Sequence, residues 1–391
     1  MPTVTWKRWN TAANLQLREL SRIDTVQSAD WNRLRGAECP FLRHEFLAAL
    51  EHHECAAPAT GWTPAHLALF DGDRLVAAAP VYRKAHSWGE FVFDFSWAQA
   101  HERHGLAYYP KLLVAVPFSP INSPRLLTAP DAAAEPLRQQ LIAALAERCG
   151  SGGVSSAHAL FISGEELASF TAAGWLARHD VQFHWHNRDY GSFEDFLAGM
   201  RSEKRKQLRR ERRRVAEQGV HYLTLHGGNI TPQQLQFAFD VHQRTFEVHG
   251  HPPYLNLPCF KELAGLLGDA LMVKLAMRGD TPVAAATFLV SHDTLYGRYW
   301  GAVGDFHSLH FETCYHQGID YCIERGLARF EPGTQGEHKL VRGFEPTPTC
   351  SAHFIADPRF RAAIADYLAR EQDAVSGYAD RASAHTPFRR E

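Results

Sequence analysis

The alternation of apolar and polar residues in the first half of the chain predicts several short helices and strands. Residues 41–52 place their apolar side chains on one helical face, which predicts a short helix. Apolar runs at 66–70 and 74–84 flank the turn sequence at 71–73, Asp-Gly-Asp, and together they predict a β-hairpin. The other elements expected in this half are helices at 28–34 and 132–148 and strands at 112–118, 159–162 and 181–187.

The second half repeats this order of elements without repeating the sequence. A second hairpin is predicted from apolar runs at 270–278 and 282–291 around Gly279-Asp280. Each half therefore indicates an α/β unit with a mixed sheet, and we expect domains at residues 15–187 and 188–375. The other elements expected here are helices at 193–218, 231–249, 260–267, 311–324 and 359–371 and strands at 221–225, 294–300 and 329–331.

The composition is that of a folded protein. Of the 391 residues, 45% are hydrophobic and 21% are charged, which argues against a disordered chain. The seven cysteines are scattered and form no C-x-x-C pair, a pattern that argues against a zinc ribbon and indicates reduced thiols. No apolar run has the length of a signal-peptide core near the start or of a membrane span elsewhere. We therefore expect a cytoplasmic protein.

Charge is distributed unevenly along the chain. The formal net charge is −2, yet residues 201–214 hold nine basic and two acidic residues, a local charge of +7 against −9 for the remainder. Like charges at helical spacing repel one another. Phosphates of a nucleotide or an RNA would relieve this repulsion, as would an anionic membrane surface. The simpler alternative is a solvated face of a helix.

A dense polar loop follows the strand predicted at 329–331. Residues 331–344 contain glycines together with Glu337, His338, Lys339 and Arg342. His338 or Glu337 can act as a general base. Lys339 or Arg342 can stabilise a developing oxyanion or hold a phosphate or carboxylate. Surface ion pairs are the alternative reading of this loop.

An aromatic strand at 295–301 carries Arg298 and Tyr299, and Glu312 and Tyr315 follow it. A buried arginine needs an anionic partner, so we expect Arg298 to pair either with Glu312 or with a substrate. These side chains are therefore candidates for substrate binding.

Two weaker patterns complete the candidates. His307, His310 and Glu312 could suggest a metal site, but no motif fixes such a geometry, and we expect packing at a helix end and no metal. The proline-rich segment 117–127 contains Arg125 and is either a rigid loop aimed at a ligand or a structural turn. The sequence has no Walker loop, G-x-S-x-G or G-x-G-x-x-G, so P-loop, α/β-hydrolase and Rossmann dehydrogenase functions lose their main support.

Together these segments resemble the FemAB-like proteins of peptidoglycan biosynthesis and recognition, within the GNAT acyltransferase superfamily. The resemblance rests on residues 117–127, 190–215, 253–255, 295–301, 310–315 and 333–344. It implies two tandem GNAT-like domains, the second opened by the basic helix. Fem-type enzymes transfer an amino acid from aminoacyl-tRNA to an amine of a peptidoglycan precursor, whereas ordinary GNAT enzymes use acyl-CoA. The chain lacks a clear Gln/Arg-x-x-Gly-x-Gly/Ala pyrophosphate loop, and Glu337-His338-Lys339 resembles a late Tyr-Lys segment with His in place of Tyr.

We therefore expect an acyl- or aminoacyltransferase that uses aminoacyl-tRNA or acyl-CoA as co-substrate and has no tightly bound cofactor. The acceptor would be an amine on a small molecule or a peptidoglycan precursor. One alternative is a non-catalytic binder of RNA, of a nucleotide-linked precursor or of an anionic membrane. Another is an enzyme that holds a metal on the histidine-rich segment of His307 and His310. The expected catalytic residues are His338, Glu337 and Lys339. The expected substrate-binding residues are Arg298, Tyr299, Arg342, Glu312, Tyr315, Arg205, Arg209, Arg210, Arg213 and Arg125.

Overall fold

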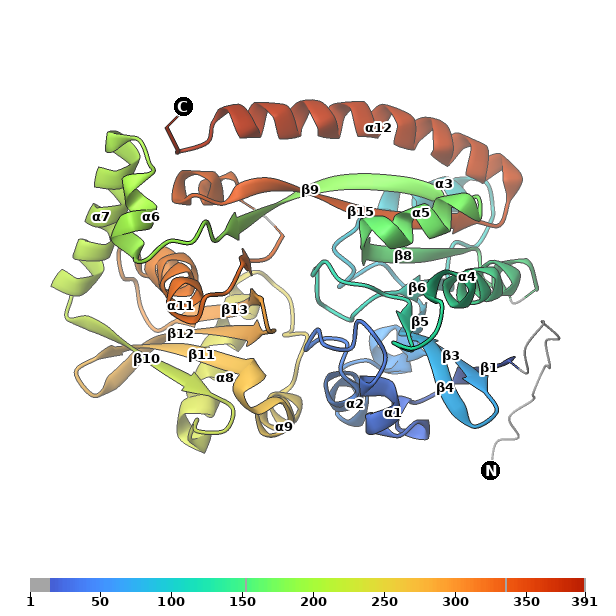
Figure 1. Cartoon of the computed structure of the whole chain (residues 1–391), viewed down its shortest axis with the longest axis horizontal. Helices are drawn as coiled ribbons and strands as arrows, with labels where there is room; N and C mark the ends of the chain where they lie inside the picture. The colour runs from blue at the N-terminus through green and yellow to red at the C-terminus, as the bar shows by residue number, and fades with distance from the viewer. Residues whose placement is uncertain (1–14, 152, 335, 390–391) are drawn as a thin grey trace. The chain divides into compact units, whose positions relative to one another are not determined.

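The computed structural model describes residues 15–151, 153–334 and 336–389 (Figure 1). It divides into two compact units. The first consists of the chain up to Asp180 together with Thr349–Val375, and the second consists of Val181–Pro348 with the segment from Ser376 onward. The sequence predicts boundaries at 187/188 and 375, whereas in the structure residues 349–375 belong with the first unit.

The first unit contains two β-sheets. A four-stranded antiparallel sheet has the order β1-β3-β4-β7, and a second group of strands has the order β15-β8-β6-β5-β2. In the second group only β6 and β8 run parallel. The strands are β1 Leu15–Leu20, β2 Trp62–Pro64, β3 His66–Asp71, β4 Arg74–Ala79, β5 Val81–Lys84, β6 Lys111–Val114, β7 Leu127–Thr128, β8 Ser156–Ile162 and β15 Glu345–Ile355. The helices are α1 Ser28–Asn32, α2 His44–His52, α3 Phe95–Arg103, α4 Ala134–Ser151, α5 Gly164–Ala172 and α12 Pro358–Ala384.

The hairpin predicted in this unit is confirmed, with Asp71 opposite Arg74 across the β3–β4 turn. The prediction of one strand over 74–84 is wrong, because these residues form β4 and β5 in two different sheets. Pro80 lies between the two strands and has no N–H to donate to a strand ladder.

The second unit contains one mixed group of strands in the order β10-β11-β12-β13-β14-β9. Its strands pair antiparallel except for β13 and β14, which run parallel. The strands are β9 Leu176–His186, β10 Val220–His226, β11 Leu271–Arg278, β12 Thr281–Val290, β13 Thr294–Ala302 and β14 Arg329–Glu331. The helices are α6 Phe193–Ala198, α7 Ser202–Glu217, α8 Pro232–Val248, α9 Leu257–Leu267, α10 Leu309–Phe311 and α11 Gln317–Arg325. A π-helical turn, η4 Glu312–His316, joins α10 to α11, and a 3₁₀ helix, η5 Glu337–Arg342, follows β14.

Local sequence explains several of these boundaries. The α8 helix begins as predicted, with Pro232 in its first turn and the Thr231 hydroxyl accepting a hydrogen bond from the Gln234 N–H. The helix expected over 193–218 is present as two helices, α6 and α7, which are separated around Gly199, and the basic segment beyond Arg201 lies in α7. The predicted hairpin of β11 and β12 is confirmed.

The core of the second unit fills the space between its strands and helices. Trp185, Phe288 and Phe330 are almost completely buried there. At Gly301 of β13 an added Cβ would lie 1.9 Å from the carbonyl oxygen of Val241 in α8, so only glycine allows this close approach of helix and strand. Among the described helices, none is long and apolar enough to cross a membrane.

Candidate functional site

A pocket lies in the second unit where two parallel strands stop pairing. The ladder of β13 and β14 joins Thr294–Tyr296 to Arg329–Glu331, after which β14 ends and β13 continues to Ala302. Beside this point is a cavity of about 150 Å³. It is lined by Ala286, Thr287, Phe288, Gly297, Arg298, Tyr299, Trp300, His310, Cys314, Tyr315 and Pro332.

A β-bulge brings two of the expected substrate-binding residues to this cavity. In the pairing of β12 with β13, Thr287 is opposite Tyr299 and Phe288 is opposite Gly297, so Arg298 is the extra residue. Bulges often redirect side chains beside active sites. Here both Arg298 and Tyr299 line the cavity.

Tyr315 connects the cavity with His338. The Tyr315 side chain lines the cavity, and its hydroxyl oxygen lies 2.9 Å from Nε2 of His338 on η5. Burial raises the pKa of Tyr315, which keeps the phenol protonated as a hydrogen-bond donor. Partial burial, together with the charges of Lys339 and Arg342, lowers the pKa of His338. A neutral imidazole able to accept a proton therefore lies one hydrogen bond from the cavity.

The other two expected catalytic residues differ in their surroundings. Lys339 is buried, and its Nζ donates a hydrogen bond to the Gly333 carbonyl at 2.7 Å. Burial lowers the pKa of Lys339 to about 7, opposed by the nearby Cys314. Glu337 is exposed and accepts a hydrogen bond from the hydroxyl of Tyr378 at 3.3 Å.

Arg342 holds η5 against α7. Its guanidinium binds both carboxylate oxygens of Glu211 at 2.9 and 3.2 Å and donates to the His338 carbonyl at 2.7 Å. It also lies 3.4 Å from the ring centre of Phe311. The structure thus gives Arg342 a protein carboxylate as its partner, where the sequence had suggested an anionic substrate.

Glu211 is a site residue that the charge pattern alone does not single out. It lies in the basic segment, yet it is buried together with Leu208 and Val215 on the inner face of α7. The spacing 208, 211, 215 is the signal that could have revealed it, because an acid in an apolar helical stripe needs a basic partner inside the protein. The same stripe shows which residues of α7 face outward.

Glu312, one of the two partners expected for Arg298, has other partners in the structure. Its carboxylate lies 2.9 Å from Nδ1 of His316 and 3.4 Å from Nε of Arg212. It therefore belongs to a buried network between η4 and α7 and is absent from the cavity lining.

The basic residues expected to bind substrate on α7 do not line the cavity. Arg209 pairs with Glu194, and Arg213 lies 3.5 Å from Glu217. Arg205 is half-buried, whereas Arg210 is exposed. The outward face of α7 nevertheless stays strongly basic. Its exposed basic residues are Lys206, Arg209, Arg210, Arg213 and Arg214, and the exposed Arg201 directly precedes the helix.

Arg125 belongs to the first unit and is completely buried. Its guanidinium donates to the carbonyl oxygens of Ser123 and Ile121 at 3.0 and 2.7 Å. These bonds hold together the loop that contains it, which agrees with the structural alternative for the proline-rich segment.

His307, His310 and Glu312 do not gather around one point. His307 lies 3.2 Å from Nη1 of Arg214, and His310 packs against the aromatic ring of Trp300. In the part of the chain that the structure describes, no three His, Cys, Asp or Glu side chains form a group suited to hold a metal ion.

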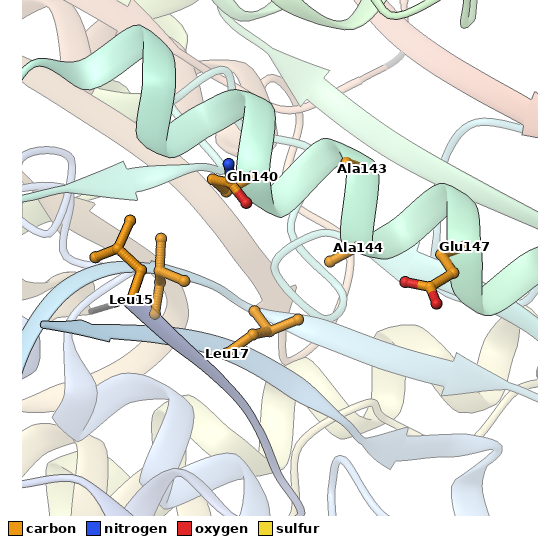
Figure 2. A pocket seen from close by; sticks show the side chains of 7 residues that line it. Leu15, Leu17, Gln140, Ala143, Ala144 and Glu147 are labelled. Atoms are coloured by element: carbon orange, nitrogen blue, oxygen red, sulfur yellow. The ribbon is translucent and has the colours of Figure 1, made fainter. Parts of the chain in front are cut away.

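A second, smaller hollow lies in the first unit between the sheet and α4. Figure 2 shows Leu15 and Leu17 of β1 across from Ala144 of α4. The hollow has a volume of about 70 Å³ and contains none of the expected site residues. Its lining is Leu15, Leu17, Leu69, Gln140, Ala143, Ala144 and Glu147.

Comparison with known proteins identifies the family. The model of the FemAB-like family, described as peptidoglycan biosynthesis/recognition, matches residues 22–390. The chain belongs to the FemAB-like family. This membership confirms the predicted relationship and the class of N-acyl- or aminoacyltransferases, and the mixed sheets described above confirm the α/β class. Donor, acceptor and site residues stay predictions.

Several solved structures are similar to this chain. L-PGS from Bacillus licheniformis is 10% identical over 79% of this chain and 90% of its own, with a TM-score of 0.49. FemX is 10% identical over 80% of this chain and 92% of its own, with a TM-score of 0.48. A tandem GNAT protein from the clavulanic acid biosynthesis pathway is 10% identical over 88% of this chain and 99% of its own, with a TM-score of 0.42. A search of the curated proteins found no significant match.

Proposed function

We propose that this FemAB-like protein transfers an acyl or aminoacyl group from aminoacyl-tRNA or acyl-CoA to an amine on a peptidoglycan precursor. The observation that carries the proposal is the pairing of Tyr315 with His338 at the wall of the cavity beside β13. An amine must lose a proton when it attacks an ester or thioester, and this pair supplies an acceptor for that proton.

In the proposed reaction the donor carbonyl lies in the cavity and the amine attacks its carbon. The new N–C bond forms while the carbonyl oxygen gains a negative charge. The proton of the amine passes to His338, either directly or through the hydroxyl of Tyr315. The intermediate then collapses, the C–O bond to tRNA or the C–S bond to CoA breaks, and His338 returns the proton to the leaving group.

Cationic groups near the cavity would stabilise the negative charge. Arg298 lines the cavity and can approach an anionic oxygen there. Lys339 lies close enough to Cys314, a cavity residue, for the two to interact electrostatically. The exposed arginines of α7 would hold the phosphates of the donor. The seven free cysteines, all within the described residues, support our placement of the reaction in the reducing cytoplasm.

The test is a transfer assay with charged tRNA and acyl-CoA as parallel donors and with peptidoglycan precursors and small amines as acceptors. We expect His338→Ala to lower the transfer rate by about 100-fold or more, the usual contribution of a general base. Tyr315→Phe should cause a smaller loss. His292→Ala is the matched control, because this side chain is 80% exposed. Unchanged transfer by His338→Ala would remove His338 from the mechanism.

A second candidate is a non-catalytic binder of RNA or of a nucleotide-linked precursor. The outward face of α7 favours it, since among the described residues neither Lys206 nor Arg210 has an ion-pair partner. This candidate requires binding that weakens steeply with salt and is unaffected by His338→Ala. Absence of transfer with every donor, combined with such binding, would favour it over the enzyme.

A further inference from the structure

The first unit contains buried basic groups that the proposed transfer does not use. Lys84 of β5 and Lys111 of β6 are directly opposite each other in the strand ladder, and both are completely buried. Residues paired in this way project from the same face of a sheet. Two like charges thus lie side by side in the interior, where each needs an anionic partner.

The carboxylates that face these lysines come from the segment that follows β5. Glu90 accepts a hydrogen bond from Nζ of Lys111 at 2.7 Å, and Asp94 accepts another at 2.5 Å. Ser87 accepts a third at 2.9 Å. Residues 87–94 therefore cover Lys84 and Lys111 and supply both counter-charges; we call these residues the cover segment.

Lys84 makes fewer hydrogen bonds to the cover segment than Lys111 does. Nζ of Lys84 donates to the Trp88 carbonyl at 3.2 Å, but it is 3.9 Å from Oε1 of Glu90, beyond hydrogen-bond distance. Among the described residues, Oε1 of Glu90 has no hydrogen-bond partner although it is buried. Burial lowers the pKa of Lys84 to about 7 and raises that of Glu90 to about 7.

Within the described chain, two further buried polar groups lack hydrogen-bond partners, and one of them belongs to the ring beside Lys84. Nζ of Lys84 lies 3.7 Å from the ring centre of Trp62, and this ring contacts that of Tyr82. The Trp62 indole N–H and the Tyr82 hydroxyl are buried, and neither has a hydrogen-bond partner in the described part of the chain. A buried donor without a partner costs about 1–3 kcal/mol. The Trp62 ring that Lys84 contacts thus carries an unused donor.

The cover segment also has unfavourable features of its own. Phe91 has a φ of 63°, a left-handed conformation that is strained for a residue with a side chain. Trp88 and Phe93 leave 54% and 50% of their surfaces in water. Such features are typical of a segment that adopts a second arrangement when a ligand binds.

We propose that Lys84 and Lys111 form a binding site for a ligand with two neighbouring oxyanions, and that Glu90 and Asp94 occupy this site in the unliganded protein. The ligand brings either two phosphates or two carboxylates, takes the hydrogen bonds of both lysines and displaces the cover segment. This site is independent of the proposed transfer reaction in the second unit.

Calorimetry on the full chain with inorganic pyrophosphate and with succinate tests the site and distinguishes its two oxyanion chemistries. Glu90→Gln removes a competing charge, so we expect about tenfold tighter binding, a change of about 1.4 kcal/mol. Lys84→Met should weaken binding by at least the same factor. Glu102→Gln and Arg103→Gln change the same charges at exposed positions of α3 and serve as matched controls. Binding of neither anion to wild type or Glu90→Gln overturns the proposal, as does binding that Lys84→Met leaves unchanged.

Hydrogen exchange provides a second readout that needs no ligand. We expect the amides of residues 87–94 to exchange faster in Glu90→Gln than in Glu102→Gln. The Glu90→Gln substitution removes an ion pair between the cover segment and Lys111. Equal exchange in the two variants would show that the cover segment does not open in this way.

Discussion

His338 and Lys339 are adjacent residues of η5, and their pKa values suit two different roles in an acyl transfer. One role is to accept a proton, and the other is to stabilise negative charge. His338 is exposed, and its pKa is lowered, so the imidazole is neutral and basic near neutral pH. Lys339 is buried with a pKa lowered to about 7, so it still carries a charge below that pH. A neutral base and a charged lysine thus coexist only over a limited range of pH.

The pH profile of transfer should show this range. The rate rises as His338 loses its proton, below the ordinary histidine pKa, and falls above about pH 7 as Lys339 loses its charge. In Lys339→Arg the guanidinium stays charged, so the alkaline fall should disappear. The measurement is kcat/KM against pH, with Lys261→Arg, an exposed lysine, as the control. An alkaline fall that Lys339→Arg retains would assign it to another group.

At the scale of elements, α7 and η5 are joined by one buried ion pair. Glu211 on α7 binds the guanidinium of Arg342 on η5, and Arg342 in turn binds the His338 carbonyl. The helix with the outward basic face is therefore connected directly to the turn that positions the candidate base. This ion pair would therefore link the binding of donor phosphates on α7 to proton transfer at His338.

Breaking this pair should affect both stability and transfer. Glu211→Gln leaves the buried Arg342 without its counter-charge, so we expect a loss of about 3 kcal/mol in the free energy of unfolding. We also expect a lower kcat, because η5, which carries His338, loses its ion pair with α7. Glu217→Gln on the same helix is the matched control, since its pair with Arg213 is exposed and contributes less than about 1 kcal/mol. Chemical denaturation and transfer assays measure the two effects, and equal stability of the two variants would contradict the role of Glu211.

The sequence predicted those elements whose signals are local. Asp71-Gly72-Asp73 and Gly279-Asp280 predict their hairpins because turn residues act on adjacent strands, and Thr231-Pro232 predicts the start of α8. The pairing of Glu211 with Arg342 could not be predicted in this way, because the two residues are 131 positions apart in the sequence. The sequence indicates Arg298 as a candidate site residue. It does not predict the β-bulge that orients Arg298, because the bulge depends on how β12 pairs with β13.

At the scale of the whole molecule, the chain passes between its two units more than once. The β9 and β15 strands and α12 each contribute residues to both units, and β15 lies mostly in the first unit although most of the second unit precedes it in the sequence. Local patterns suggested two consecutive domains, because a long-range strand pairing leaves no local signal. The core of the first unit contains Ile355 and Leu368 beside Trp97.

A fragment of residues 15–187 should therefore fail to fold although it spans the domain expected from the sequence. It lacks residues Cys350–Ile355 of β15, which pair with β8, and it lacks Glu371, which binds Arg178 at 2.7 and 2.8 Å. Joining residues 345–375 to this fragment through a flexible Gly/Ser linker should restore a cooperative thermal transition by circular dichroism, because β8 regains its neighbour and the core regains Ile355 and Leu368. A cooperative transition of the 15–187 fragment alone, at the temperature of the joined fragment, would show that β15 is dispensable for the first unit.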